Sequence, residues 1–319
     1  MKNNRKEQDK VLQKKRKKRR KKRRNRSSRL VKVIYTLAAL SALATIGTFF
    51  YPEVSDAWNR YVSSKMISEY VENKSLPEDF EKEISMAKEY NKKLFDESSN
   101  NISAYTLKLS GDTSKEDSAS LSGEVLHPDK EYESQVDVLN NGMIGYIEIP
   151  QIGVSLPVYH YTSEEVLAKG IGHLYGSSLP VGGENTHAVL TGHCGLMDAR
   201  LFTDLDKLKE GDRFTVNVFD EKLNYEIDQI KTVLPNELDD LAISKGEDYV
   251  TLMTCTPYGI NSHRLLVRGR RIPDDIEVKA DQSVLNTVKE TVRFPVTIFI
   301  LTGLCILADM IIIIRIWRN

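Results

Sequence analysis

The sequence has few cysteines and histidines, and it lacks the short motifs that identify nucleotide-dependent and zinc enzymes. Three cysteines and six histidines occur in 319 residues. Three cysteines do not build a disulfide framework, although an exported chain could have used one. The histidines are too scattered to indicate a metal, and no Walker, GxGxxG or zinc-ligand spacing is present. We therefore predict no cofactor and no metal.

The chain also has no formal net charge, but this value is the sum of a strongly basic segment and an acidic remainder. Residues 1–30 hold seventeen Lys and Arg against two acidic residues, so the remaining chain is acidic by about fifteen charges. The basic run Lys14–Arg24 is compatible with nucleic-acid binding or nuclear import. The uncharged apolar stretch Val33–Tyr51 argues against both, because it is about long enough to cross a bilayer and follows the positive charge that marks the cytoplasmic side. We predict a membrane partner and no nucleic acid.

A second apolar stretch of spanning length runs from Phe294 to Trp317. Two spans place both termini in the cytoplasm and the segment between them outside the cell membrane. Asp309 would be costly facing lipid, so either the span ends near it or it faces the first span. The first stretch could instead be a signal peptide cleaved near Ala42–Ala44, but apolar residues continue through Tyr51 and the basic region is long, which favours an uncleaved anchor.

The external segment changes character along its length. Apolar residues at three- and four-residue spacing predict helices from residue 55 to about 101. Residues 100–136 are polar, and we weigh a lid against a disordered spacer. From Met143 onward many short apolar runs alternate with turns, including 145–149, 154–158, 214–218 and 223–233, which predicts a mainly β fold, a closed β-barrel. Short helices are expected at 164–169 and 198–208.

These patterns give the following divisions of the chain: a basic cytoplasmic tail (1–30), a transmembrane anchor (31–52), a helical segment (53–100), a polar loop (101–137), the barrel (138–276), a connector (277–293), a second transmembrane helix (294–317) and a short cytoplasmic tail (318–319).

Two strand ends carry the candidate chemistry. Cys255 ends the β-patterned run 251–255, and Arg264 begins the next run after a turn-rich loop, so the guanidinium should face the sulfur. His193 follows the apolar run 188–190 at another strand end. A free thiol is only a few per cent thiolate near neutrality, so a cysteine nucleophile needs such an imidazole partner. His263 is turned to the other face by strand alternation.

The segments TLMTC, TPYGINSHRLLVRG and THAVLTGH resemble the signature of sortases, membrane-anchored cysteine transpeptidases of Gram-positive bacteria. The similarity runs from about Gly142 to about Ile272, and it is greatest to class C sortases, which polymerise pilins. The resemblance implies Cys255 as nucleophile, His193 as general acid/base and Arg264 as the residue that binds substrate and steadies the oxyanion. It also implies a sortase-type barrel.

Class C sortases usually carry a lid with an Asp-Pro-aromatic anchor over the cysteine, and this chain departs from that pattern. The only proline in the loop is Pro128, preceded by His127 and followed by Asp129. We name these three residues as the candidate lid anchor. Tyr105 and Tyr132 are the nearest aromatic residues and the next candidates.

The other cysteines have structural interpretations. Cys305 lies in the second apolar stretch and is expected to be a packing residue. Cys194 should point away from His193 along an extended strand, so a bridge to Cys255 is not expected unless a turn begins at Gly192.

The function expected from the resemblance is cleavage of an LPxTG-like motif through a thioacyl intermediate, followed by transfer to a lysine amine of a pilin. A sortase that uses a cell-wall amine or water as acceptor is the alternative for LPxTG-bearing surface proteins. A non-enzymatic surface scaffold would not require the three residues together.

Overall fold

The computed structural model describes residues 2–73, 77–100, 129–137, 139–196 and 199–273, with short pieces between 303 and 315. The chain divides into two units, Met1–Pro52 with Phe294–Asn319, and Glu53–Arg293. Among the described residues, the single helical segment long and apolar enough to cross a membrane is Arg29–Asn73. The predicted second span and Asp309 lie largely or wholly outside the described residues, so two spans remain a prediction.

Two helices precede the barrel in sequence. Helix α1 runs from Lys2 to Asn73 and α2 from Pro77 to Asn100. Helix α1 is rich in Lys, Arg, Ala and Leu, and α2 is rich in Glu and Lys; all of these are strong helix formers. The predicted helical segment is therefore confirmed, and Ile84, Ala87 and Leu94 of α2 are buried in the core. The apolar positions of α1 were expected to be core as well, but Trp58, Tyr61, Val62 and Val71 are exposed. Asn91 also fixes α2, since its side chain accepts a hydrogen bond from the amide of Leu179 (2.7 Å) and donates one to the carbonyl of the same residue (2.9 Å).

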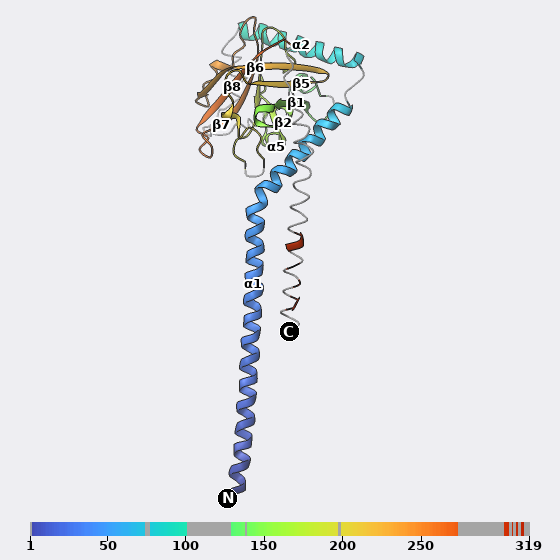
Figure 1. Ribbon diagram of the computed structural model, residues 1–319. Helices are drawn as coiled ribbons and strands as arrows, with labels where there is room; N and C mark the ends of the chain where they lie inside the picture. Colours follow the sequence, from blue (N-terminus) through green and yellow to red (C-terminus); the bar gives the residue numbers. More distant parts are fainter. Residues whose placement is uncertain are drawn as a thin grey trace. The chain divides into compact units, whose positions relative to one another are not determined.

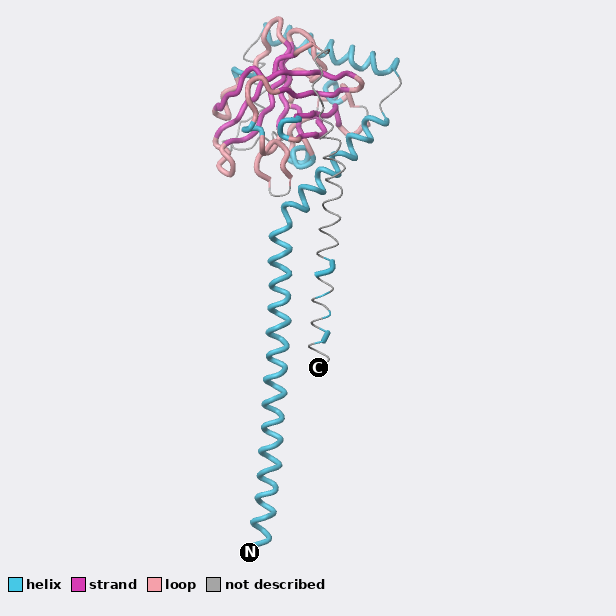
Figure 2. Tube along the Cα trace, viewed as in Figure 1, coloured by secondary structure: helices cyan, strands magenta, loops and turns pink. Residues whose placement is uncertain are grey.

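Eight strands form a closed barrel (Figure 1; strands are magenta in Figure 2). Their order around the barrel is β1-β2-β3-β4-β7-β8-β6-β5. The bounds are β1 Met143–Ile149, β2 Val154–His160, β3 Ile171–His173, β4 Thr186–Thr191, β5 Arg213–Val218, β6 Glu221–Val233, β7 Asp248–Thr256 and β8 His263–Arg271. The predicted barrel is confirmed, and closure leaves no unpaired sheet edge.

The pairing of β4 decides where the site forms. Strands β7 and β8 are joined by a short loop and run antiparallel. Strand β4 lies parallel to β7, with Thr191 opposite Met253, although about sixty residues separate the two in sequence. Strand β3 between β2 and β4 was not predicted, because three residues are too short to show a periodic pattern.

The short helices were predicted with mixed success. Helix α5, Glu164–Lys169, is confirmed at the expected residues, and its N-cap Ser163 accepts a hydrogen bond from the amide of Val166. The helix expected over 198–208 is wrong. In its place are turns and a 3-10 turn, η2, Leu205–Lys207. Phe202 and Leu205 are fully buried there, so their apolar spacing reflects two anchors of a loop.

Strand alternation separates two apolar clusters. The barrel interior includes Leu190, Leu252 and Val267. The opposite face of the same three strands contributes Val189, Met253 and Leu266 to a second cluster. Three buried residues from other elements complete this cluster: Leu94, Val233 and Leu241. Cys255 and Arg264 have the strand parity of Met253 and Leu266, so they belong to this outer face.

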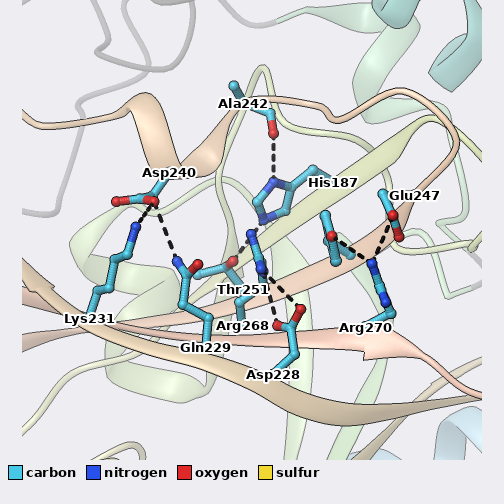
Figure 3. Close-up of polar contacts among 11 residues, drawn as sticks. His187, Asp228, Gln229, Lys231, Asp240, Ala242, Glu247, Thr251, Arg268 and Arg270 are labelled. Carbon is cyan, nitrogen blue, oxygen red and sulfur yellow. Dashed lines mark hydrogen bonds and ion pairs between the residues drawn. The ribbon is translucent and has the colours of Figure 1, made fainter.

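Polar residues on the outer face of β6, β7 and β8 form satisfied pairs (Figure 3). The His187 ring bridges the carbonyl of Ala242 (3.0 Å) and the hydroxyl of Thr251 (2.7 Å). Arg268 binds both carboxylate oxygens of Asp228 at 3.0 Å. Because each of these groups has a protein partner, we interpret them as structural, and His187 as a tie between β4, β7 and the connection before β7.

Candidate active site

Cys255 and Arg264 are directly opposite one another on β7 and β8. Directly opposed residues of an antiparallel pair share a face and lie at close Cβ separation. Both side chains are buried, Cys255 at 8% and Arg264 at 5% of their exposable surface. The sequence prediction that the guanidinium faces the sulfur agrees with this register.

Arg264 is a buried cation without a carboxylate partner among the described residues. Its Nη1 donates to the carbonyls of Asn261 (3.3 Å) and His263 (3.2 Å), both in or beside its own loop. Buried charges are normally paired. The Arg264 charge is close enough to the Cys255 thiol to favour its ionised form.

The electrostatics of Cys255 contain two opposing effects. Burial raises the pKa of the Cys255 thiol above its ordinary value, and the nearby Arg264 charge partly offsets that rise. The resting side chain is therefore mainly a thiol near neutral pH. A nucleophilic role for this cysteine would therefore require a base that generates the thiolate.

His193 lies two residues beyond the end of β4, the parallel neighbour of β7. Its side chain is 22% exposed, and its Nε2 lies 3.6 Å from Oε2 of Glu164 on α5. The amide of Phe202 donates to the His193 carbonyl (3.1 Å). The topology thus places Cys255 and Arg264 on the paired strands β7 and β8, and His193 two residues beyond the end of β4, which is the other neighbour of β7.

Glu164 was not singled out from the sequence as a site residue. Its carboxylate is 71% exposed, so any ion pair with His193 is solvent-screened and weak. This contact depends on the strand order, which places the start of α5 beside the residues that follow β4. A contact of this kind leaves no local signal in the sequence.

Cys194 lies outside any strand, so the prediction about its side-chain direction rested on the wrong local structure. Strand β4 ends at Thr191, and the Cys194 sulfur lies 4.0 Å from the Thr203 carbonyl. Both Cys194 and Cys255 are free thiols, as expected. Burial raises the Cys194 pKa, with smaller contributions from Asp206, Cys255 and Asp204.

Of the three predicted lid residues, only Asp129 lies within the described part of the chain. His127, Pro128 and Tyr105 lie outside it. Asp129 caps helix α4 (Lys130–Glu133) by accepting from the amides of Glu131 and Tyr132. Its other carboxylate oxygen accepts from the Tyr175 hydroxyl (2.8 Å), and its amide donates to the Tyr161 hydroxyl (3.0 Å). These contacts tie Asp129 to the barrel.

Tyr132, the other aromatic candidate, is completely buried. Its hydroxyl lies 2.6 Å from Nδ1 of His173. The His173 Nε2 lies 2.8 Å from the carbonyl of Ser178. The structure therefore packs Tyr132 of helix α4 into the hydrophobic core next to the barrel.

The loop between β7 and β8 presents two exposed apolar side chains that sequence reasoning did not single out. Tyr258 is 65% exposed and Ile260 is 72% exposed. The Tyr258 ring also approaches the loop after His193, because a Cβ added at Gly195 would lie 2.6 Å from its Cε2. The loop that carries His193 and the loop between β7 and β8 are therefore in contact.

Comparisons with known proteins identify the family to which this barrel is related. The sequence model of the sortase domain family matches residues 147–272 of this chain. Sortase C1 from Streptococcus agalactiae is 46% identical, over 66% of this chain and 100% of that one, with a TM-score of 0.54. A sortase C from Clostridium perfringens, solved with the C-terminal cell wall sorting motif, is 42% identical over 66% and 99% of the two chains (TM-score 0.52). The pilus-related sortase C of Group B Streptococcus is 38% identical over 66% and 97% (TM-score 0.55).

The closed barrel with a buried cysteine and arginine on paired strands defines a protein of the sortase fold. The chain belongs to the sortase family, a family of cysteine transpeptidases, and these solved relatives are class C enzymes. The chain spans about three fifths of the length of the curated sortases that it matches.

Proposed function

We propose that this protein is a membrane-anchored cysteine transpeptidase that cleaves an LPxTG-like sorting motif and joins it to a lysine amine of a pilin subunit. The observation that carries the proposal is the direct pairing of Cys255 with Arg264, both buried, beside the strand that leads to His193. Such an arrangement supplies a nucleophile, a charge for the oxyanion and a proton carrier.

In the first half-reaction the Cys255 thiolate attacks the carbonyl carbon of the motif threonine. Negative charge develops on the carbonyl oxygen, where the Arg264 guanidinium stabilises it. The carbon–nitrogen bond then breaks, and protonated His193 gives its proton to the leaving amine. A thioester on Cys255 remains.

In the second half-reaction a lysine amine attacks the thioester carbonyl, and His193 accepts the proton that the amine loses. The carbon–sulfur bond breaks, the new amide leaves, and the Cys255 thiolate is regenerated. Each bond formed is thus matched by one broken, and no cofactor is needed for the cycle.

The relatives support the substrate class at the level of the family. One related sortase C was solved with a sorting motif, and another is described as pilus-related. Anchoring to a cell-wall amine is the alternative acceptor reaction, and hydrolysis by water is the simplest competing outcome.

The membrane arrangement forms part of the proposal. The apolar segment within Arg29–Asn73 supports an anchor, and the basic residues before it support a cytoplasmic N-terminus. A second span from 294 to 317 then returns the C-terminus to the cytoplasm and leaves the catalytic barrel extracellular. Cysteine labelling of engineered sites near each terminus in intact cells tests this topology.

The deciding experiment incubates the full chain in detergent micelles with an LPxTG peptide and candidate pilins, followed by mass spectrometry. We expect an acyl-enzyme on Cys255 and a peptide–pilin conjugate through a lysine. A product joined only to a cell-wall-type amine would favour the alternative. No acyl-enzyme with any sorting peptide would contradict the proposal.

A further inference from the structure

A hydrogen bond joins Thr254, the residue before Cys255, to Gly192, the residue before His193. Thr254 lies on β7, and its hydroxyl donates to the Gly192 carbonyl at 2.7 Å. The Thr254 side chain is buried, at 2% exposed. Strand alternation turns Thr254 to the face opposite Cys255, which is the barrel interior. Its hydroxyl is therefore directed away from the face where Cys255 would meet a substrate.

Gly192 is held by two consecutive residues of β7. Its amide donates to the Met253 carbonyl at 3.1 Å, and its carbonyl accepts from Thr254. The residue is also closely packed, since an added Cβ would lie 2.7 Å from Cδ1 of Ile171 and 2.8 Å from Cδ2 of Phe202. The peptide that leads into His193 is thus fixed from both sides.

We propose that Thr254 is a positioning residue that sets His193 relative to Cys255. This inference rests on the proposed function, in which His193 exchanges protons at the sulfur and at the amine. Proton transfer needs donor and acceptor within about 2.6–3.2 Å. Without the hydroxyl, the Gly192 carbonyl loses its partner on β7. Of the two hydrogen bonds between Gly192 and β7, the one from the Gly192 amide to the Met253 carbonyl then remains. A shift on the order of 1 Å there is enough to lower turnover on the order of a hundredfold.

The variants separate the hydroxyl from the shape of the side chain. Thr254→Val keeps the branched shape and removes the donor, whereas Thr254→Ser keeps the donor. Thr215→Val is the matched control. Thr215 lies on β5, is also buried, and donates a hydrogen bond from its hydroxyl to Oδ1 of Asn224 on β6 at 2.9 Å. Neither of these strands carries a proposed site residue. We expect kcat to fall between about tenfold and a hundredfold in Thr254→Val with little change in KM. Thr254→Ser should recover most of that loss, and Thr215→Val should stay within about twofold of wild type.

The mechanism of the effect is tested by alkylation of Cys255 with iodoacetamide as a function of pH, using the full chain in detergent. Because this reagent contains no sorting motif, the readout depends only on how His193 and Arg264 affect the thiol. We expect the Thr254→Val pH profile to shift toward that of His193→Ala. In the His193→Ala background, Thr254→Val should cause no further change, since residues that act through one another are not additive.

The outcomes are distinct. A wild-type pH profile and wild-type turnover in folded Thr254→Val would overturn the inference, as would an equal additional loss in the His193→Ala background. Circular dichroism establishes folding, and Thr254→Ala replaces the Val variant if the latter fails to fold. A wild-type protein that forms no acyl-enzyme with sorting peptides refutes the proposed function, while the alkylation profiles still decide the role of Thr254.

Discussion

Asp56 on helix α1 accepts a hydrogen bond from the backbone amide of Arg200, at 3.0 Å, in the loop that follows His193. The Asp56 side chain is buried, and its second oxygen pairs with Arg60 at 2.9 Å. The same loop returns to the site through the bond from the Phe202 amide to the His193 carbonyl. Helix α1 therefore helps to hold the loop that carries the proposed general acid/base.

Replacing Asp56 by Ala should weaken both the fold and the reaction. The Arg200 amide would lose a partly buried hydrogen bond, which contributes about 0.5–1.5 kcal/mol. Turnover should fall as the loop loosens. Arg60→Ala is the control, since it removes only a partly exposed ion pair worth about 0–1 kcal/mol. Urea unfolding and peptide turnover measure the two effects, and equal losses in both variants would contradict the role of the Arg200 contact.

The two cysteines near the site should respond differently to alanine substitution. Cys255→Ala should abolish the acyl-enzyme and the product while the barrel stays folded, because only the thiolate supplies the nucleophile. Cys194→Ala should be nearly neutral, because the hydrogen bond from its sulfur to the Thr203 carbonyl is long and weak. Mass spectrometry of the intermediate decides both, and loss of activity in Cys194→Ala comparable to that of Cys255→Ala would show the second prediction wrong.

Arg264→Lys should lower turnover on the order of a hundredfold or more while Cys255 still reacts with small alkylating agents. Lysine keeps the charge but loses the planar fork held by the Asn261 and His263 carbonyls. Arg264→Gln should in addition move the alkylation profile to higher pH, because the Arg264 charge opposes the burial-driven rise in the Cys255 pKa. Wild-type turnover in Arg264→Lys would show that the planar guanidinium is not required for the reaction.

His187 should make stability depend on acid. Burial, above all, lowers the pKa of His187 from 6.5 to about 4. The unfolded chain therefore takes up a proton on His187 below about pH 6.5 while the folded protein does not, so stability is full above that pH and is lost as the pH falls toward 4. His187→Gln should reduce the slope of unfolding free energy by about 1.4 kcal/mol per pH unit between pH 6 and 5. Urea titrations at several pH values measure it, and the slopes above pH 7.5 serve as the internal control. An unchanged slope between pH 6 and 5 would contradict the prediction.

Asp129→Ala tests the one predicted lid residue that the structure describes. Loss of the α4 cap and of the Tyr175 contact should cost about 1–2 kcal/mol in unfolding free energy. If Asp129 also anchors a lid over Cys255, alkylation of the sulfur should become faster under conditions where the barrel stays folded. Unchanged alkylation would leave Asp129 as a helix cap and remove it from the lid prediction.

Local patterns in the sequence were sufficient for much of the fold. Alternating apolar residues predicted most of the strands because each strand of the barrel has one face in the core, as at Leu252 and Val267. The pairing of Cys255 with Arg264 was also predictable, because a short loop joins their strands. The helix expected over 198–208 failed because Phe202 and Leu205 have helical spacing but anchor a loop.

What the sequence by itself determined were features decided by neighbours along the chain: the long apolar helix, the strand alternation and the loop that opposes Cys255 to Arg264. Tertiary structure alone decided that β4 lies parallel to β7, which brings His193 to the site across about sixty residues. It also decided the contacts of Thr254 with Gly192 and of Asp56 with Arg200. Such contacts join residues distant in sequence, and a single threonine or aspartate in a periodic run carries no local signal of the partner it will meet.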